Sequence, residues 1–313
     1  MNLRNALAHF RMRLVGALLA VAVSACGWVA SGNKTAGSIR PLHAYEPGAM
    51  TVVGAENFYA DLLHQIGGSN LKIFTFLSDP AVDPHLYGSS AADARVVADS
   101  RLVIQNGLGY DSFMDKLLAA SPNSSRVVIN VQKLIGVADG ANPHVWYDPT
   151  VMPRVARAAA SALAQLDPAH AETYATNLAT FEGSLKEVND EIASLKQRYA
   201  GVPVAFTEPV FGYMSDAIGL SVKSPEEFMK AVEEGNDAPS RAVAEEQDLI
   251  THHRVRVLMY NNQTVTKVTA AIRDLAVSNG VPVVGVSETA PPGTTFQKWQ
   301  LSTLKELESA LGK

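Results

Sequence analysis

Short apolar stretches alternate with amphipathic ones along the chain from residue 50 onward. Runs rich in β-branched residues are typical of strands, and they lie at 51–54, 71–76, 102–104 and 126–131. Helical patterns fall near 58–66 and 91–98. Because strands that alternate with helices usually build a parallel sheet covered by helices, this half of the chain predicts an α/β lobe.

A second series of the same kind begins at residue 202. Its strands are expected at 202–206, 256–260 and 281–286, and its helices at 240–252 and 265–278. We therefore expect a second α/β lobe.

The segment between the two series carries one long apolar stripe. Asp167 and Pro168 supply an N-cap and a first-turn proline. After them, apolar residues repeat at steps of three and four as far as residue 199, at Leu178, Phe181, Leu185, Val188, Ile192 and Leu195. This period predicts one continuous helix over 167–199. The expected fold class is thus α/β, with two βα lobes that contain parallel sheets and are joined by one long linking helix.

The N-terminal end has a different pattern. Arg4, Arg11 and Arg13 precede an uncharged apolar run over 14–23, which is too short for a membrane-spanning helix. This layout predicts a secretory signal peptide over residues 1–25. The run ends at Cys26 in a stretch that resembles the lipobox of bacterial lipoproteins. The resemblance implies cleavage before Cys26 and a lipid on that cysteine. The alternative is a signal peptide with a chance cysteine near its end.

The remaining chain divides into four expected segments. Residues 26–48, rich in Gly, Ser and Ala, predict a flexible tether that starts at the lipidated Cys26. The N-terminal lobe is expected over 49–166, the linking helix over 167–199 and the C-terminal lobe over 200–313.

Charge and cysteine usage exclude several classes of protein. Without residues 1–25 the chain keeps 23 basic and 31 acidic side chains, a net charge of −8. A nucleic-acid-binding protein would show the opposite balance. Cys26 is the only cysteine in the 313-residue sequence, so the chain can form neither an internal disulfide nor a site with several thiolates.

Four polar side chains follow predicted strands. His85 and His144 come from the first lobe, and Glu208 and Glu288 come from the second. All four lie beyond the carboxyl ends of parallel strands, where open α/β sheets place their ligand sites. Two imidazoles and two carboxylates that meet in the cleft between the lobes would suit Mn²⁺, Zn²⁺ or Fe²⁺, and the lack of sulfur argues against Cu⁺.

Each of these residues also has a simpler explanation. A histidine after a proline is often a turn residue, and a glutamate before a proline is often an acid at a helix start. The spacings between the four positions match no short local motif. The residues taken singly therefore leave both interpretations open.

A family resemblance joins these positions together. The chain resembles the zinc/manganese solute-binding proteins of bacterial ABC importers, the cluster A-I metal-binding family. The resemblance covers nearly the whole chain after the tether, in stretches that include Asp83-Pro84-His85, Asn142-Pro143-His144 and Thr207-Glu208-Pro209. In this family a residue from each of four loops holds the metal between two lobes. His85 and His144 match the family's first two ligands and Glu208 falls at the third. The fourth is usually aspartate, and here the nearest acid is Glu288.

The resemblance implies a function. The chain would be the extracytoplasmic, lipid-anchored receptor of an ABC importer on the bacterial cell membrane. It would capture one Mn²⁺ or Zn²⁺ ion, with Fe²⁺ also open, and deliver it to the membrane permease. We expect a monomer with no enzymatic activity and no nucleic-acid partner. Zinc importers of this family commonly carry a histidine-rich, acid-rich loop between the first two ligands. This chain lacks such a loop between His85 and His144, which favours manganese. Asp83 and Asp148 are candidates for orienting the imidazoles, although both also fit ordinary turns.

Two alternatives use the same residues differently. A secreted metal-dependent hydrolase with the same His/Glu site would need an open coordination position for water or substrate. A metal-free adhesin or a receptor for an organic solute would need aromatic walls and amide groups at the four loops.

Overall fold

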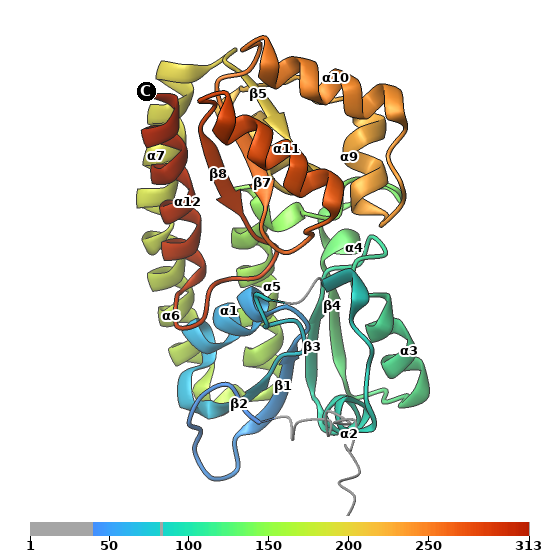
Figure 1. Cartoon of the computed structure of the whole chain (residues 1–313). Helices are drawn as coiled ribbons and strands as arrows, with labels where there is room; N and C mark the ends of the chain where they lie inside the picture. The colour runs from blue at the N-terminus through green and yellow to red at the C-terminus, as the bar shows by residue number, and fades with distance from the viewer. Residues whose placement is uncertain (1–39, 82–83, 313) are drawn as a thin grey trace, which may run out of the picture. The chain divides into compact units, whose positions relative to one another are not determined.

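A computed structural model describes residues 40–81 and 84–312 of the chain, and Figure 1 shows how their elements are arranged. The predicted signal peptide over 1–25, Cys26, most of the predicted tether and Asp83 lie outside the described residues. The last part of the tether is described: the backbone N–H groups of Leu42 and Glu46 donate to the carbonyls of Ile73 and Ser69, both at 2.8 Å. No helix in the described ranges is long and apolar enough to cross a membrane.

The N-terminal lobe is built on a four-stranded parallel sheet in the order β2-β1-β3-β4. Its strands are β1 (Met50–Gly54), β2 (Leu71–Phe74), β3 (Leu102–Gln105) and β4 (Val127–Asn130). Its helices are α1 (Asn57–Gly67), α2 (Ala91–Asp99), α3 (Ser112–Ala120), α4 (Val131–Ile135) and α5 (Val151–Leu166). Most strand residues are buried because helices cover the sheet, which explains their nearly unbroken apolar sequence.

The C-terminal lobe repeats this plan with the order β6-β5-β7-β8. Its strands are β5 (Pro203–Phe206), β6 (Ser221–Val222), β7 (Leu258–Asn261) and β8 (Val283–Val286). Its helices are α8 (Gly212–Ile218), α9 (Glu226–Glu233), α10 (Ser240–Thr251), α11 (Lys267–Ser278) and α12 (Phe296–Leu311). Single turns of 3₁₀ helix complete the described elements: η1 (Gly68–Asn70), η2 (Pro84–Leu86), η3 (Val145–Tyr147), η4 (Pro168–His170) and η5 (Pro209–Phe211). The prediction of two α/β lobes with parallel sheets is confirmed.

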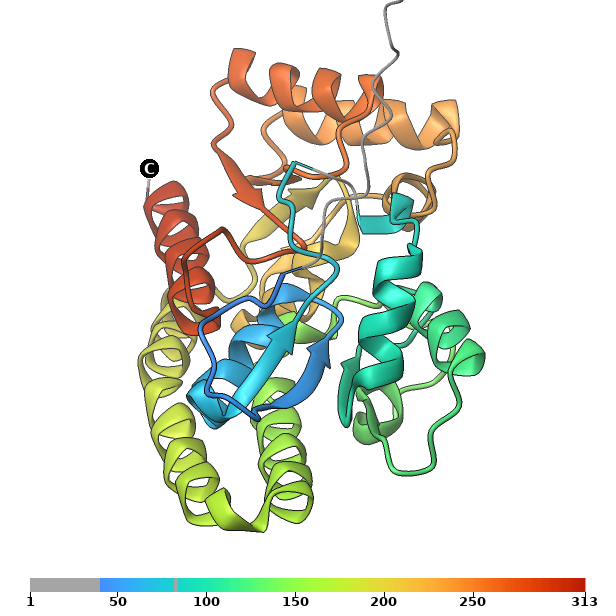
Figure 2. The same ribbon diagram turned by 90° about the horizontal axis from the view of Figure 1, so that it is seen from below.

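The long linking helix is also confirmed, but it has two segments. After η4 come α6 (Ala171–Ser184) and α7 (Lys186–Tyr199), which meet at Leu185. The N–H of Leu185 donates to the carbonyl of Glu182, three residues back, at 3.3 Å, which is the tighter 3₁₀ pattern. In Figure 1, α6 lies beside the N-terminal lobe and α7 lies beside α12. In Figure 2, α5 and α6 form a helical hairpin.

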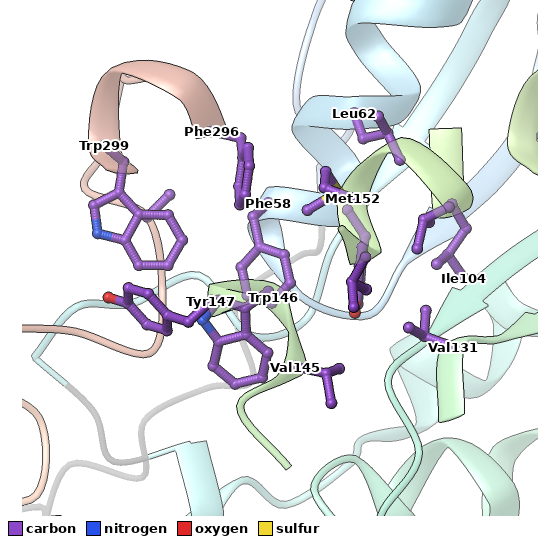
Figure 3. Close-up of a cluster of buried hydrophobic side chains, with 14 of the residues drawn as sticks. Phe58, Leu62, Ile104, Val131, Val145, Trp146, Tyr147, Met152, Phe296 and Trp299 are labelled. Carbon is purple, nitrogen blue, oxygen red and sulfur yellow. The ribbon is translucent and has the colours of Figure 1, made fainter. Parts of the chain in front are cut away.

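Two apolar cores support the lobes. The larger one is continuous through both lobes, and Figure 3 shows its aromatic seam. Phe58 of α1 lies 4.8 Å from the ring of Trp146, and Tyr147 lies 5.5 Å from the ring of Trp299 in α12. The smaller core is confined to the C-terminal lobe, between its sheet and the helices α9 to α11, and includes Phe228 and Val232 of α9.

Candidate metal centre

All four side chains predicted from the sequence meet at one place. His85 lies in η2, after β2, and His144 directly precedes η3. Glu208 follows β5 and precedes η5, and Glu288 follows β8. One ligand atom from each residue lies within 4.8 Å of the ligand atoms of the others. Since each side chain follows the carboxyl end of a strand or the short helix after it, the two sheets bring these atoms together.

The separations between donor atoms suit a single ion. The Nε2 atoms of His85 and His144 each lie 3.4 Å from Oε2 of Glu288, and His85 Nε2 lies 3.9 Å from Oε1 of Glu208. Donors that surround zinc tetrahedrally at about 2.1 Å lie about 3.4 Å from one another. The cluster could therefore hold one metal ion after small side-chain adjustments.

The cluster is open to a cavity on the side of His85. His144, Glu208 and Glu288 are buried, whereas the side chain of His85 is 24% exposed. A cavity of about 590 Å³ reaches the cluster at His85 and is lined by Tyr110, Pro143 and Met229, among other residues. An ion would enter and leave past His85.

Asn142 orients the imidazole of His144. The Nδ1–H of His144 donates to Oδ1 of Asn142 at 2.7 Å, and the backbone N–H of His144 donates to the same oxygen at 3.0 Å. The Asn142 amide N–H donates in turn to the carbonyl of Pro209 at 2.7 Å, in the other lobe. This arrangement leaves Nε2 of His144 directed at Glu288 as a metal donor. Sequence reasoning offered Asp148 instead, but its carboxylate accepts hydrogen bonds from Thr150 in a turn.

Asn261 and Gln263 position the two carboxylates. The Asn261 side-chain amide donates to Oε2 of Glu208 and, at 2.8 Å, to Oε1 of Glu288. Oε1 of Gln263 accepts hydrogen bonds from the backbone N–H groups of Glu288 and Thr289, at 2.7 and 2.9 Å. One carboxylate oxygen of each glutamate is therefore held by an amide while the other faces the cluster. A single sequence gives amide side chains of this kind no periodic or spacing signal.

The imidazoles and carboxylates of the cluster shift one another's pKa values. Burial alone would lower the pKa of His85, but the hydrogen bond and charge of Glu288, with the charges of Glu233 and Glu208, raise it to about 9. Burial, followed by the charges of Glu288 and Glu233, raises the pKa of Glu208 well above its usual value. Burial would raise the pKa of Glu288 as well, but its hydrogen bonds with His144 and His85 hold that pKa below the usual range. An incoming metal ion would displace the imidazole proton.

A third carboxylate, which sequence reasoning missed, lies at the rim of the cluster. Glu233, the last residue of α9, is 4.0 Å from Nε2 of His85 and 3.8 Å from Nδ1 of His144. The one available signal was its place at the edge of the apolar helix face formed by Phe228, Met229 and Val232.

The ligand loops also join the lobes to each other. Beside the bond from Asn142 to Pro209, the hydroxyl of Tyr147 donates to the carbonyl of Ser287 at 2.8 Å. Asn57 of α1 exchanges two hydrogen bonds, at 2.7 and 2.9 Å, with the backbone of Ala290. The loops that carry His144 and Glu288 are therefore tied to the opposite lobe.

Comparisons with known proteins cover most of the chain, from about residue 52 onward. A family model described as "Zinc-uptake complex component A periplasmic" matches residues 52–310. The manganese-binding lipoprotein MntA of Bacillus subtilis is 24% identical over 242 residues, which covers 74% of this chain and 77% of that protein. The zinc-binding protein TroA of Treponema pallidum is 23% identical over 247 residues, or 75% and 76% of the two chains. The solved structure of the periplasmic zinc-binding protein TroA superposes with a TM-score of 0.72 at 22% identity, covering 84% of this chain and 99% of the other.

Proposed function

This chain belongs to the zinc-uptake complex component A family, and from that membership we propose that it is the extracytoplasmic solute-binding component of an ABC importer. It captures one Mn²⁺ or Zn²⁺ ion and delivers it to a membrane permease. Relatives named for manganese and for zinc support either ion as cargo.

One observation carries this proposal. Four loops from two separate sheets bring two imidazoles and two carboxylates within 4.8 Å of one another, and three of these four side chains are buried. Burying such groups without a partner is costly, so a divalent cation at their centre explains the arrangement. His85 and His144 supply the nitrogen donors, and Glu208 and Glu288 supply the oxygen donors.

Members of this family bind metal ions for transport, and the chain is not an enzyme. The donor set agrees with that role, because four protein ligands fill a tetrahedral Zn²⁺ site and leave no position there for an attacking water. Among the comparisons, nothing favours the hydrolase alternative.

The anchoring of the chain is part of the proposal. Residues 1–25 direct export, and cleavage then leaves Cys26 as a lipidated N-terminus that holds a monomer at the outer face of the cell membrane. The lipobox-like stretch before Cys26 supports this assignment, and so does the description of a relative as a lipoprotein.

Metal analysis of the purified chain from residue 27 onward tests the function. We expect close to one ion per chain and a higher Tm with Mn²⁺ or Zn²⁺, since a ligand present at 100 times its Kd stabilises the folded state by about 2.7 kcal/mol. His85→Ala and His144→Ala should each lower the affinity, while His252→Ala, on the surface, should not. A wild-type chain that binds neither ion would refute the proposal.

A further inference from the structure

Glu233 reaches the metal centre from a helix that carries none of the four ligands. Its Oε1 lies 4.0 Å from Nε2 of His85, and its Oε2 lies 3.8 Å from Nδ1 of His144. The side chain is 13% exposed and lines the same cavity as His85. The carboxylate thus stands at the mouth of the cluster.

No other interaction in the described part of the chain accounts for this placement. Both distances are too long for hydrogen bonds, and Oε2 is buried without a hydrogen-bond partner among the described residues. Nδ1 of His144 already donates to Asn142, so Glu233 does not orient that ring. The adjacent Glu234 behaves differently, because it is 50% exposed and pairs with Lys230 at 3.8 Å.

The position of Glu233 is unfavourable without a cation. It is the third carboxylate at the cluster, beside Glu208 and Glu288, and like charges repel strongly where water is scarce. It also ends a helix, where the partial charge of the backbone is negative and acids are disfavoured. Among the described residues its ion pairs are with the two histidines of the cluster.

The backbone fixes Glu233 while the side chain keeps freedom to move. Phe228 and Val232 anchor α9 in the smaller core, and Gly235, two residues after the helix, has φ +66°, a conformation that does not continue a helix. A glutamate has three rotatable side-chain bonds, so its carboxylate can shift toward an ion without movement of the helix.

We propose that Glu233 is a further oxygen ligand, which joins the coordination sphere of the cargo ion from the cavity side of the cluster and selects Mn²⁺ over Zn²⁺. This inference rests on the proposed function. Zn²⁺ is satisfied by four donors, whereas Mn²⁺ prefers a higher coordination number and carboxylate or water oxygens. An added carboxylate therefore strengthens Mn²⁺ binding more than Zn²⁺ binding.

Three variants of the full mature chain test the inference: Glu233→Gln, Glu233→Asp and the matched control Glu234→Gln. Competitive titration should show that Glu233→Gln weakens Mn²⁺ binding about 10- to 100-fold and Zn²⁺ binding less than about threefold. In Glu233→Gln, bound Mn²⁺ should relax water protons faster than in the wild-type chain, since a water molecule replaces the lost ligand. Glu233→Asp should resemble Glu233→Gln, because the shorter side chain withdraws the carboxylate from the ion.

Four outcomes would overturn the inference. In the first, Glu233→Gln matches Glu234→Gln for both ions. In the second, it weakens Mn²⁺ and Zn²⁺ equally, which means that the residue does not select between them. In the third, Glu233→Asp keeps the wild-type Mn²⁺ affinity that Glu233→Gln loses, which means that charge alone matters. In the fourth, bound Mn²⁺ gains no water. In each case wild-type metal binding remains, so the proposed function survives, whereas a wild-type chain that binds neither ion would refute the proposed function itself.

Discussion

The inner wall of the proposed metal centre, formed by His144, Glu208 and Glu288, is built differently from its outer wall, formed by His85 and Glu233. Inner-wall side chains are buried, and amides hold them: Asn142 binds His144, while Asn261 binds both glutamates. Outer-wall side chains are partly exposed and line the cavity.

Glu233 of the outer wall also rests on a different core from the inner wall. Residues that flank the inner-wall ligands, such as Val145, Phe206 and Val286, belong to the large core that runs through both lobes. Glu233 instead ends α9, which packs on the smaller core of the C-terminal lobe. This difference indicates that the two walls contribute differently to metal binding. A preorganised inner wall provides affinity, because its ordering cost is met during folding, and a looser outer wall allows exchange and discrimination.

The largest expected effect comes from breaking the inner wall at His144. His144→Ala removes a buried donor that no water can easily replace, so Mn²⁺ and Zn²⁺ affinity should fall by at least about 100-fold. Isothermal titration against wild type and His252→Ala measures the loss. A loss of less than about tenfold would contradict the assignment of His144 to a preorganised wall.

A smaller loss should follow from breaking the outer wall at His85. In His85→Ala, water from the cavity can occupy the vacated position, so affinity should fall by about 10- to 100-fold and by less than in His144→Ala. The neighbouring surface change Leu86→Ala serves as the control, since Leu86 is exposed. If the two histidine variants lose affinity equally, the distinction between the walls fails for this pair.

How far the sequence predicts this site depends on the kind of residue. That the four candidate ligands lie together could be predicted because each follows a strand, or the short helix after one, and the apolar β-branched runs mark the strands clearly. The break at Leu185 could not, because the apolar stripe passes through that position unchanged and only the local hydrogen bonding departs from the α-helical pattern. Glu233 follows no strand and lies among three other acids of the same segment, Glu226, Glu227 and Glu234, which are exposed.

The amide of Asn261, which holds both glutamates of the inner wall, provides a further test of the difference between the two walls. Asn261→Ala leaves two buried carboxylates without their shared donor, so metal affinity should fall by about tenfold while all proposed ligands remain. The metal-free chain should also lose about 1–3 kcal/mol of stability in urea unfolding, because buried acceptors become unpaired. The adjacent Asn262→Ala, at an exposed position, should change neither quantity. Wild-type affinity in Asn261→Ala would show that the inner wall does not need its amide.

The smallest effect on metal affinity is expected from a change at Glu246, in the core beneath α9, whose main effect should be on stability. Burial raises the pKa of Glu246, in α10, from 4.5 to about 8. Between these two pH values the folded chain keeps a proton that the unfolded chain has lost. Stability should therefore fall as pH rises through this window, by on the order of a few kcal/mol.

Glu246→Gln should remove that fall, and Glu245→Gln, at an exposed position paired with Arg241, should keep it. Urea unfolding of the metal-free chain at pH 5 and pH 8.5 distinguishes the two variants. An unchanged pH slope in Glu246→Gln would mean that this carboxyl does not govern the stability of the smaller core.

The donor set has a consequence for redox chemistry. All the side chains assigned to the site offer nitrogen or oxygen, and the sole cysteine of the chain is Cys26, far from them in sequence. Thiolate sites empty when their sulfur is oxidised or alkylated, whereas imidazoles and carboxylates resist mild oxidants and thiol reagents. Metal capture by this chain should therefore proceed unchanged in aerated or reducing surroundings.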